Sequence, residues 1–351
     1  MQLTISRNDL ARVIGNVARV VEARNTIPIL SNLMLTAAGG GLAVMGTDLD
    51  IVATAAAEAD VATNGSVCVD AKLLSDIAKK AGADTITMTL NDGRLIVKSG
   101  RSRFALATLP AEDFPDLGTH DFDAEFDIDL AALFAPVSFA ISTEATRYYL
   151  NGVFLHNIGG KAVAVATDGH RLARQIGPEV PAFPAVIVPA KLVALMPKGA
   201  VRVSISSAKI RIVADDITMT SKLIDGTFPD YERVIPAKNE HKVIVDRDEF
   251  LKAADRVVTV SSQKSRAVKL SIADGAVAFS AHSEVGDATD EIAAAYDGEA
   301  LEVGYNSQYL KDMLGVLPTG EVVLAIADAG SPALVTGGLA DWTGVVMPMR
   351  V

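Results

Sequence analysis

Asp168 and His170 are the residues of this sequence whose types and spacing could support acid/base chemistry. A carboxylate and an imidazole within hydrogen-bond reach can exchange a proton with a substrate, as they do in many hydrolases. The two residues stand two positions apart in the segment Thr-Asp-Gly-His-Arg-Leu at 167–172, and no nucleophile or metal partner accompanies them in the sequence. A hydrolase is therefore the alternative hypothesis, and the segment is interpreted first as part of a binding surface.

Other catalytic chemistry finds little support in the sequence. The phosphate-binding patterns G-x-x-x-x-G-K-[ST] and G-x-G-x-x-G are absent, and the five histidines lack the spacing of metal ligands. Cys68 is the only cysteine, so neither an intrachain disulfide nor a cysteine-based metal cluster can form. We expect a protein without a cofactor, without a bound metal and without enzymatic activity.

Composition bounds the class of protein. The chain has 351 residues, half of them hydrophobic, 21% charged and 5% aromatic, which suits two or three globular domains with aliphatic cores. No stretch reaches the roughly 18 consecutive apolar residues that a membrane-spanning helix needs. The first 14 residues carry Arg7, Asp9 and Arg12 with no apolar run behind them, unlike a signal peptide. We expect a cytoplasmic protein.

The elements that must position any site are organised by an internal repeat. Three segments open alike, with a short alternating strand that leads into an amphipathic helix, at 3–10, 126–133 and 243–250. In each of them a residue that favours the helix N-cap, Ser6, Asp129 or Asp246, stands where the period changes from two to that of a helix. Three such openings indicate three copies of one folding unit.

The rest of each segment agrees with this division. A glycine-containing turn followed by an alternating strand recurs at 41–48, 160–168 and 274–280, and a second strand-to-helix step recurs at 67–74, 186–193 and 301–310. The first two copies end in Phe-Pro-Asp at 114–116 and 228–230, whereas the third ends in the segment 345–351. Polar stretches at 118–125 and 236–242 suit linkers between the copies.

The fold class follows from these patterns. We predict an α+β protein of three repeated domains, 1–119, 120–240 and 241–351, each with antiparallel sheets that carry two helices on one side. Similar domains that share consistent sheet edges can form an arc, and an arc can close by head-to-tail contact with a second copy. The sequence therefore predicts half of a closed ring.

The triplication and three motifs together resemble the bacterial DNA sliding clamp family, the beta subunit of DNA polymerase III. The motifs are Thr-Asp-Gly-His-Arg-Leu at 167–172, Phe-Pro-Asp-Tyr at 228–231 and Val-Met-Pro-Met-Arg at 346–350. The resemblance implies a homodimeric ring that encircles duplex DNA without sequence preference and slides on it as a processivity factor. It also implies that an ATP-driven clamp loader opens the ring, and that the replicative polymerase and other replication and repair proteins bind through short peptide motifs.

Repeats one and two separate scaffold from function in the first of these motifs. Thr47 and Asp48 align with Thr167 and Asp168, so the turn itself is predicted to be architectural, with the aspartate bonded to nearby backbone groups. By resemblance, a peptide-binding groove lies between domains two and three. It is expected to be lined by Leu150, Thr167, Gly169, His170, Arg171, Leu172, Pro229, Arg233, Val234, Asn306, Tyr309, Val345, Val346, Met347, Pro348, Met349 and Arg350. Ser265 and Pro332 depart from the family pattern beside this groove.

The distribution of charge fits a sleeve around DNA better than the net charge of −11 suggests. The expected helical stretches, 1–24, 67–82, 127–147, 186–199, 246–266 and 302–315, hold 16 Lys and Arg against 13 Asp and Glu; they carry +3, so the remainder carries −14. Twelve helices about 9 Å apart would enclose a hole of roughly 24 Å, wide enough for a duplex. DNA contacts are expected at Arg24, Lys72, Tyr148, Tyr149 and Lys191, partly by resemblance.

A single-strand-binding protein is the third hypothesis. Such proteins stack bases on aromatic side chains in basic grooves, whereas here Trp342 is the sole tryptophan and the Phe and Tyr residues follow core-like alternation. For the clamp, the subunit contact is expected where a strand edge at Phe104 and Leu106 meets Thr259 and Val260 of a second copy, because an unpaired apolar edge would otherwise invite aggregation.

Overall fold

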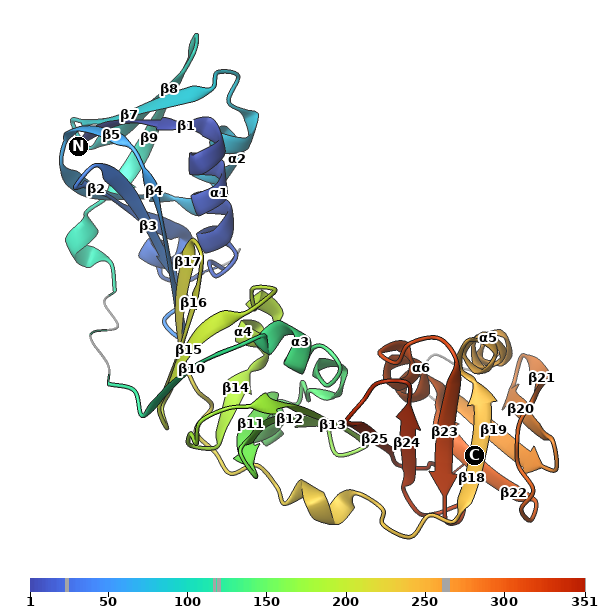
Figure 1. Cartoon of the computed structure of the whole chain (residues 1–351). Helices are drawn as coiled ribbons and strands as arrows, with labels where there is room; N and C mark the ends of the chain where they lie inside the picture. Colours follow the sequence, from blue (N-terminus) through green and yellow to red (C-terminus); the bar gives the residue numbers. More distant parts are fainter. Residues whose placement is uncertain (23–24, 116–117, 119–120, 261–265, 351) are drawn as a thin grey trace. The chain divides into compact units, whose positions relative to one another are not determined.

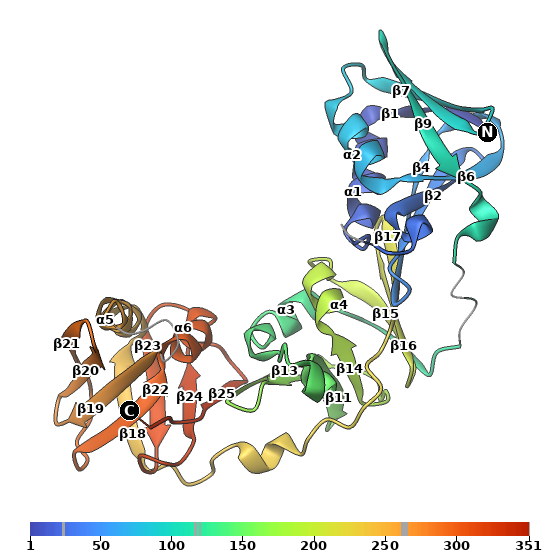
Figure 2. The same cartoon turned by 180° about the vertical axis from the view of Figure 1, so that it is seen from behind.

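The structure is a computed structural model that describes residues 1–22, 25–115, 118, 121–260 and 266–350. It forms two compact units, one from Met1–Asp129 with Ala194–Leu223 and the other from Leu130–Val193 with Ile224–Val351. Figure 1 and, from behind, Figure 2 show that both are built mainly from strands. Every strand pair in the described part of the chain is antiparallel, which confirms the predicted sheet type.

The first unit contains one sheet of thirteen strands in the order β10-β15-β16-β17-β4-β3-β2-β6-β9-β8-β7-β1-β5. Its strands are β1 (Gln2–Ser6), β2 (Asn32–Ala38), β3 (Gly41–Thr47), β4 (Ile51–Glu58), β5 (Asp60–Thr63), β6 (Gly65–Asp70), β7 (Thr85–Asn91), β8 (Arg94–Ser99), β9 (Ser102–Leu109), β10 (Ala124–Ile128), β15 (Val201–Ile205), β16 (Lys209–Ala214) and β17 (Ile217–Lys222). Strand β17 pairs with β4, so a strand of the second repeat continues the sheet of the first.

Two helices, α1 (Arg7–Ala18) and α2 (Ala71–Lys80), lie side by side in the first unit. The Ser6 hydroxyl caps α1 by accepting from the Asp9 amide at 3.2 Å, as the sequence predicts. Leu10, Val13, Ile14 and Val17 are buried, and their i, i+3, i+4, i+7 spacing is that of one helix face. This face can approach β3 closely because residue 46 is glycine; a Cβ there would lie 2.9 Å from a methyl of Val17.

The second unit contains two sheets. The larger has eight strands in the order β14-β11-β12-β13-β25-β24-β23-β18, and the smaller has four in the order β21-β20-β19-β22. The strands are β11 (Gly152–Ile158), β12 (Lys161–Thr167), β13 (Arg171–Glu179), β14 (Val186–Pro189), β18 (His241–Asp246), β19 (Ala267–Ala273), β20 (Ala276–Ser283), β21 (Gly286–Ala293), β22 (Leu301–Asn306), β23 (Glu321–Ile326), β24 (Ala333–Gly337) and β25 (Trp342–Val346).

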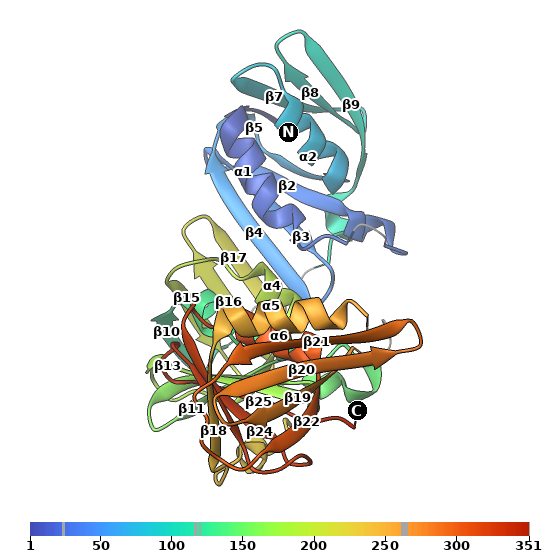
Figure 3. The same cartoon turned by 90° about the vertical axis from the view of Figure 1, so that its right-hand side faces the viewer.

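The longest helix of this unit, α5 (Arg247–Val258), lies across β19, β20 and β21, as Figure 3 shows. The Asp246 carboxylate caps it by accepting from two backbone amides at 2.9 Å each, which confirms that predicted N-cap. Helix α6 (Ser307–Gly315) packs beside α5. The helices of the second repeat are short: α3 (Leu130–Phe134) begins directly after Asp129, and α4 (Ala190–Leu195) has six residues.

Short 3₁₀-helices complete the fold at Pro28–Ser31, Ala111–Asp113, Ser138–Ala140, Ala145–Leu150 and Tyr231–Val234. Among the described residues no helix is long and apolar enough to cross a membrane. The helices and antiparallel sheets of both units confirm the predicted α+β class.

Candidate functional site

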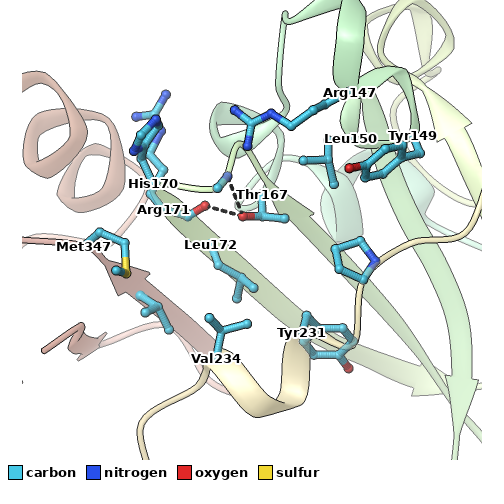
Figure 4. A pocket seen from close by; sticks show the side chains of 13 residues that line it. Arg147, Tyr149, Leu150, Thr167, His170, Arg171, Leu172, Tyr231, Val234 and Met347 are labelled. Atoms are coloured by element: carbon cyan, nitrogen blue, oxygen red, sulfur yellow. Dashed lines mark hydrogen bonds between the residues drawn. The ribbon is translucent and has the colours of Figure 1, made fainter.

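A cavity of about 250 Å³ lies in the second unit, and Figure 4 shows its lining. Leucine, valine, proline and methionine make up half of the side chains in this lining, and the basic side chains of Arg147, His170 and Arg171 lie along one side. It is lined by Arg147, Tyr149, Leu150, Thr167, Gly169, His170, Arg171, Leu172, Pro229, Tyr231, Val234, Val345 and Met347. Such a site favours a ligand that buries apolar side chains while its polar atoms meet the rim.

The floor of the cavity is a strand pair. Leu172 of β13 lies opposite Val345 of β25, and both side chains are buried. Beyond the end of β25 the pairing continues, because the Met347 amide donates to the His170 carbonyl at 2.8 Å. The site therefore exists only where a strand of repeat two meets a strand of repeat three.

The turn before β13 is held by its own side chains. The Thr167 hydroxyl donates to the Arg171 carbonyl at 2.7 Å and accepts from the Gly169 amide at 3.1 Å, and both bonds appear in Figure 4. The Asp168 carboxylate accepts from the amides of His170 and Arg171 at 2.9 and 3.0 Å. These bonds confirm that the aspartate satisfies local backbone groups.

The same carboxylate also binds the Arg171 guanidinium, whose Nε lies 3.0 Å from Asp168 Oδ2. Both carboxylate oxygens of Asp168 are thus committed to the turn, which leaves it unsuited to act as a general base. The His170 ring stacks on Tyr309, with centroids 6.0 Å apart. Among the described residues no cluster of His, Cys, Asp or Glu could hold a metal ion. The geometry does not support the hydrolase hypothesis.

Arg171 connects repeats two and three. Its Nη1 donates to Asp312 of α6 at 2.6 Å, its Nη2 donates to the Phe139 carbonyl at 2.8 Å, and its guanidinium lies 4.6 Å from the Tyr309 ring centroid. Its side chain is only 10% exposed. A buried guanidinium is tolerated because every edge of it meets an acceptor or an aromatic face.

An aromatic cluster supports the cavity from behind. The Phe154 ring stacks on Phe228 at 4.7 Å and on His156 at 4.6 Å, and the Tyr231 hydroxyl lies 3.2 Å from His156 Nε2. Burial, with the charge of Arg174 as a smaller cause, lowers the pKa of His156 to about 4. Phe228 and Tyr231 thereby anchor the chain segment that carries Pro229 and Val234 to the cavity.

Comparison with known proteins gives the same family for all parts of the chain. Family models described as the N-terminal, central and C-terminal domains of the DNA polymerase III beta subunit match residues 1–118, 128–230 and 232–350. The chain belongs to this family of beta sliding clamps. Beta sliding clamps of Caulobacter vibrioides, Pseudomonas aeruginosa and Escherichia coli are 42%, 39% and 35% identical to it, each over 100% of both chains.

Solved clamp structures have the same fold. The clamp of Bartonella birtlesii bound to griselimycin has a TM-score of 0.96 at 40% identity, and that of Pseudomonas aeruginosa bound to griselimycin has 0.95 at 38%, both with 100% of each chain covered. Three repeated clamp domains are therefore shown for this chain.

Ten of the residues expected to form the peptide groove line the cavity. These are Leu150, Thr167, Gly169, His170, Arg171, Leu172, Pro229, Val234, Val345 and Met347. Seven do not line it: Arg233, Asn306, Tyr309, Val346, Pro348, Met349 and Arg350. Of these, Tyr309 packs against His170 and Arg171, Asn306 caps α6, and Val346 is fully buried between its partners in the sheet. Pro348, Met349 and Arg350 line a separate hollow beside Gly304.

Three residues reach the cavity without having been assigned to it from the sequence. Arg147 and Tyr231 were missed, and Tyr149 was expected at DNA instead. Tyr231 belongs to the quoted Phe-Pro-Asp-Tyr motif, which was a usable signal. Arg147 carries no such signal, because its contact with the turn joins residues more than 20 positions apart. Pro332 accepts a hydrogen bond from Asn239 through its carbonyl, and Ser265 lies outside the described residues.

The residues expected at DNA and at the subunit contact are dispersed. Tyr148 is 54% exposed, Lys72 is exposed on α2 and Lys191 is half-buried on α4, whereas Arg24 lies outside the described residues. Phe104 is 37% exposed on β9, and Leu106 points into the core of its own unit. Thr259 is exposed and Val260 half-buried directly after α5. Their roles stay predictions.

Replacing Arg171 by lysine should lower the free energy of unfolding by about 2 kcal/mol, because one ammonium nitrogen cannot reach three acceptors that the guanidinium meets through three separate nitrogens. Arg233→Lys is the matched control: Arg233 also pairs with an aspartate three positions earlier, but its side chain is 86% exposed. Urea unfolding should show the loss for the first variant and no change for the second. Equal stabilities for the two variants would contradict the anchoring role.

The buried His156 predicts a dependence of stability on pH. Its folded-state pKa of about 4 lies below the usual value of 6.5, so its neutral form is favoured in the folded protein and its contribution is complete above pH 6.5. Stability should fall as the pH is lowered from 6.5 toward 4, since the unfolded chain takes up this proton first. In His156→Gln the melting temperature should depend less on pH between 6.5 and 4 than in the wild type. An unchanged slope of melting temperature against pH would contradict this prediction.

Proposed function

We propose that this chain is one half of a homodimeric ring that encircles duplex DNA, slides on it and tethers the replicative polymerase. The observation that carries this conclusion is the match of all three clamp domains over the whole chain. The chain acts as a processivity factor and is not an enzyme. Domain limits of 1–119, 120–240 and 241–351, and a cytoplasmic location where the chromosome is replicated, are part of the proposal.

Two strand edges support the dimer. Over Ser102–Ala107, β9 pairs with β8 on one side and has no strand on the other among the described residues, and β21 likewise pairs only with β20. The β8–β9 hairpin carries Arg94, Lys98, Arg101 and Arg103, whereas β21 carries Asp287, Asp290 and Glu291. Edges of opposite charge attract, while two copies of either edge repel, which favours head-to-tail pairing.

The cavity supports the second half of the function. A partner that must be tethered yet exchanged needs a compact apolar anchor rather than a large interface, and a cavity of about 250 Å³ accommodates a few side chains of a short peptide. The bond from the Met347 amide to the His170 carbonyl holds together two residues of its lining. We assign the docking of the polymerase, the clamp loader and other replication and repair proteins to this cavity.

DNA contact is assigned to Arg24, Lys72, Tyr148, Tyr149 and Lys191. A few dispersed cations and tyrosines suit a sleeve, because each neutralised phosphate adds affinity and would slow sliding. The rings of Tyr148 and Tyr149 meet edge to face, with centroids 5.9 Å apart. Tyr149 lines the cavity, whereas Tyr148 is exposed.

The ring can be tested on circular DNA. Once loaded by a clamp loader and ATP, the protein should remain on a nicked plasmid through gel filtration and be lost when a restriction enzyme linearises the plasmid. Retention on both forms would contradict the ring and would favour a protein that grips DNA directly, such as the single-strand binder.

The dimer contact can be tested by charge. Phe104→Asp combined with Val260→Asp should give folded monomer with a native mass near 36.7 kDa, whereas the wild type should have twice that mass. Phe104 is preferred to Leu106 because Leu106 is buried within its own subunit and an aspartate there would disturb folding. Ile158→Asp, also at an exposed apolar site, is the control and should stay dimeric. A dimeric double variant would place the contact elsewhere.

Removal of residues 347–351 should weaken docking without affecting the dimer. The cut begins after Val346, because Val346 is fully buried and pairs with Arg171 and Ala333. Affinity for a polymerase-derived peptide should fall by about 2–4 kcal/mol, the usual loss of an anchoring contact. His170→Ala should give a milder defect, and removal of 350–351 alone should keep the amide bonds of Met347 and Met349. Calorimetry showing normal affinity after the longer truncation would place the docking site elsewhere.

A further inference from the structure

The turn at the head of β13 has a twin in the first unit. In Thr47–Ile51 the Thr47 hydroxyl donates to the Ile51 carbonyl at 2.9 Å, and Asp48 accepts from the amides of Asp50 and Ile51 at 2.9 and 2.7 Å. The amide of Lys222 donates to the Asp50 carbonyl at 2.8 Å, just as Met347 donates to His170. Backbone and hydrogen bonds are thus repeated, including the bond to the neighbouring repeat.

The two turns share their threonine and aspartate and differ at the next three positions, where Leu49-Asp50-Ile51 stands against Gly169-His170-Arg171. The third residue takes a left-handed conformation in both, with φ of 78° at Leu49 and 88° at Gly169. The turn therefore accepts a side chain in repeat one, so its backbone alone does not require glycine at 169. Another reason for the glycine must lie in what surrounds it.

That reason is Arg147. Its guanidinium lies over Gly169: a Cβ at residue 169 would be 3.5 Å from Cζ and well inside contact distance of Nη1. The Nε and Nη2 of Arg147 bind the two carboxylate oxygens of Glu144 at 2.8 Å each. Its Nη1 has no hydrogen-bond partner among the described residues, and Figure 4 shows the group above the turn beside the cavity.

The aligned position in the first repeat has no such donor. The segments Thr-Ile-Pro-Ile-Leu at 26–30 and Thr-Arg-Tyr-Tyr-Leu at 146–150 both precede a central strand, so Ile27 takes the place of Arg147. Ile27 and Leu49 are 47% and 36% exposed, and neither side chain can donate a hydrogen bond. The repeats keep the turn and differ at these two aligned positions.

We propose that Gly169 is a positioning residue that determines which ligands the cavity accepts. By lacking a side chain it seats Arg147 so that Nη1 is held at the mouth, where it donates to a carbonyl or carboxylate oxygen of an extended peptide whose apolar side chain enters the cavity. Glu144 fixes the other edge of the guanidinium, so the donor is already oriented before the ligand arrives. This role rests on the proposed docking function.

The test is a double-mutant cycle on the full-length dimer, with a fluorescent synthetic peptide copied from the clamp-binding segment of the replicative polymerase and griselimycin as competitor. Arg147→Ala removes the donor, and Gly169→Asn displaces it while keeping a residue that tolerates a left-handed backbone. Each change should weaken the peptide about tenfold, the size of one charge-assisted hydrogen bond. The double variant should also lose about tenfold, because both changes remove the same interaction.

Leu49→Gly and Ile27→Arg are the matched controls in the twin turn and should leave peptide affinity unchanged. Thermal unfolding of each variant shows whether a loss of affinity comes from a loss of folding. If Gly169 had a purely structural role, the two losses would be additive, and the double variant would lose about a hundredfold. Additive losses, or normal affinity in Gly169→Asn, would overturn the positioning role alone. A wild-type protein that did not bind the peptide would overturn the docking function and this role together.

Discussion

The pairing of β13 with β25 is the contact on which the rest of the site depends. Five residue pairs, from Gln175 opposite Trp342 to Arg171 opposite Val346, join a strand of repeat two to a strand of repeat three in one continuous sheet. Trp342 is buried at one end of this pairing and donates through its indole nitrogen to the Pro136 carbonyl at 2.9 Å. The cavity lies at the other end, so its shape is set by a sheet register, which a one-residue slip would destroy.

A buried charge network holds the same end of the sheet. Arg171 is satisfied by Asp168 from its own turn, by Asp312 from α6 and by the Phe139 carbonyl, so two repeats must be correctly placed before its desolvation is compensated. Polar networks of this kind select one arrangement more than they add stability, because any partial loss leaves a charge buried without a partner. The rim of the cavity thereby stays rigid around an apolar interior.

The comparison between repeats shows how a docking site arises on a scaffold. The turns at Thr47 and Thr167 share their hydrogen bonds and their pairing with the next repeat, so these features belong to the scaffold. The residues at two aligned positions differ, with Ile27 and Leu49 in one copy where the other has Arg147 and Gly169. Function on this fold lies in a few substitutions on a repeated backbone, which agrees with the general separation of fold and function.

The sequence alone determined the triplication, the N-caps at Ser6 and Asp246 and the aspartate-bonded turn, because each is encoded within a few neighbouring residues by periodicity or local hydrogen bonding. Ten cavity residues were reached through family resemblance and motif. Only the tertiary structure decided that Arg147 covers Gly169, that Tyr231 supports the cavity and that Val346 is buried in the sheet. These facts depend on residues far apart in the chain, and which way a side chain points at the end of a strand or turn is set by packing against those distant partners.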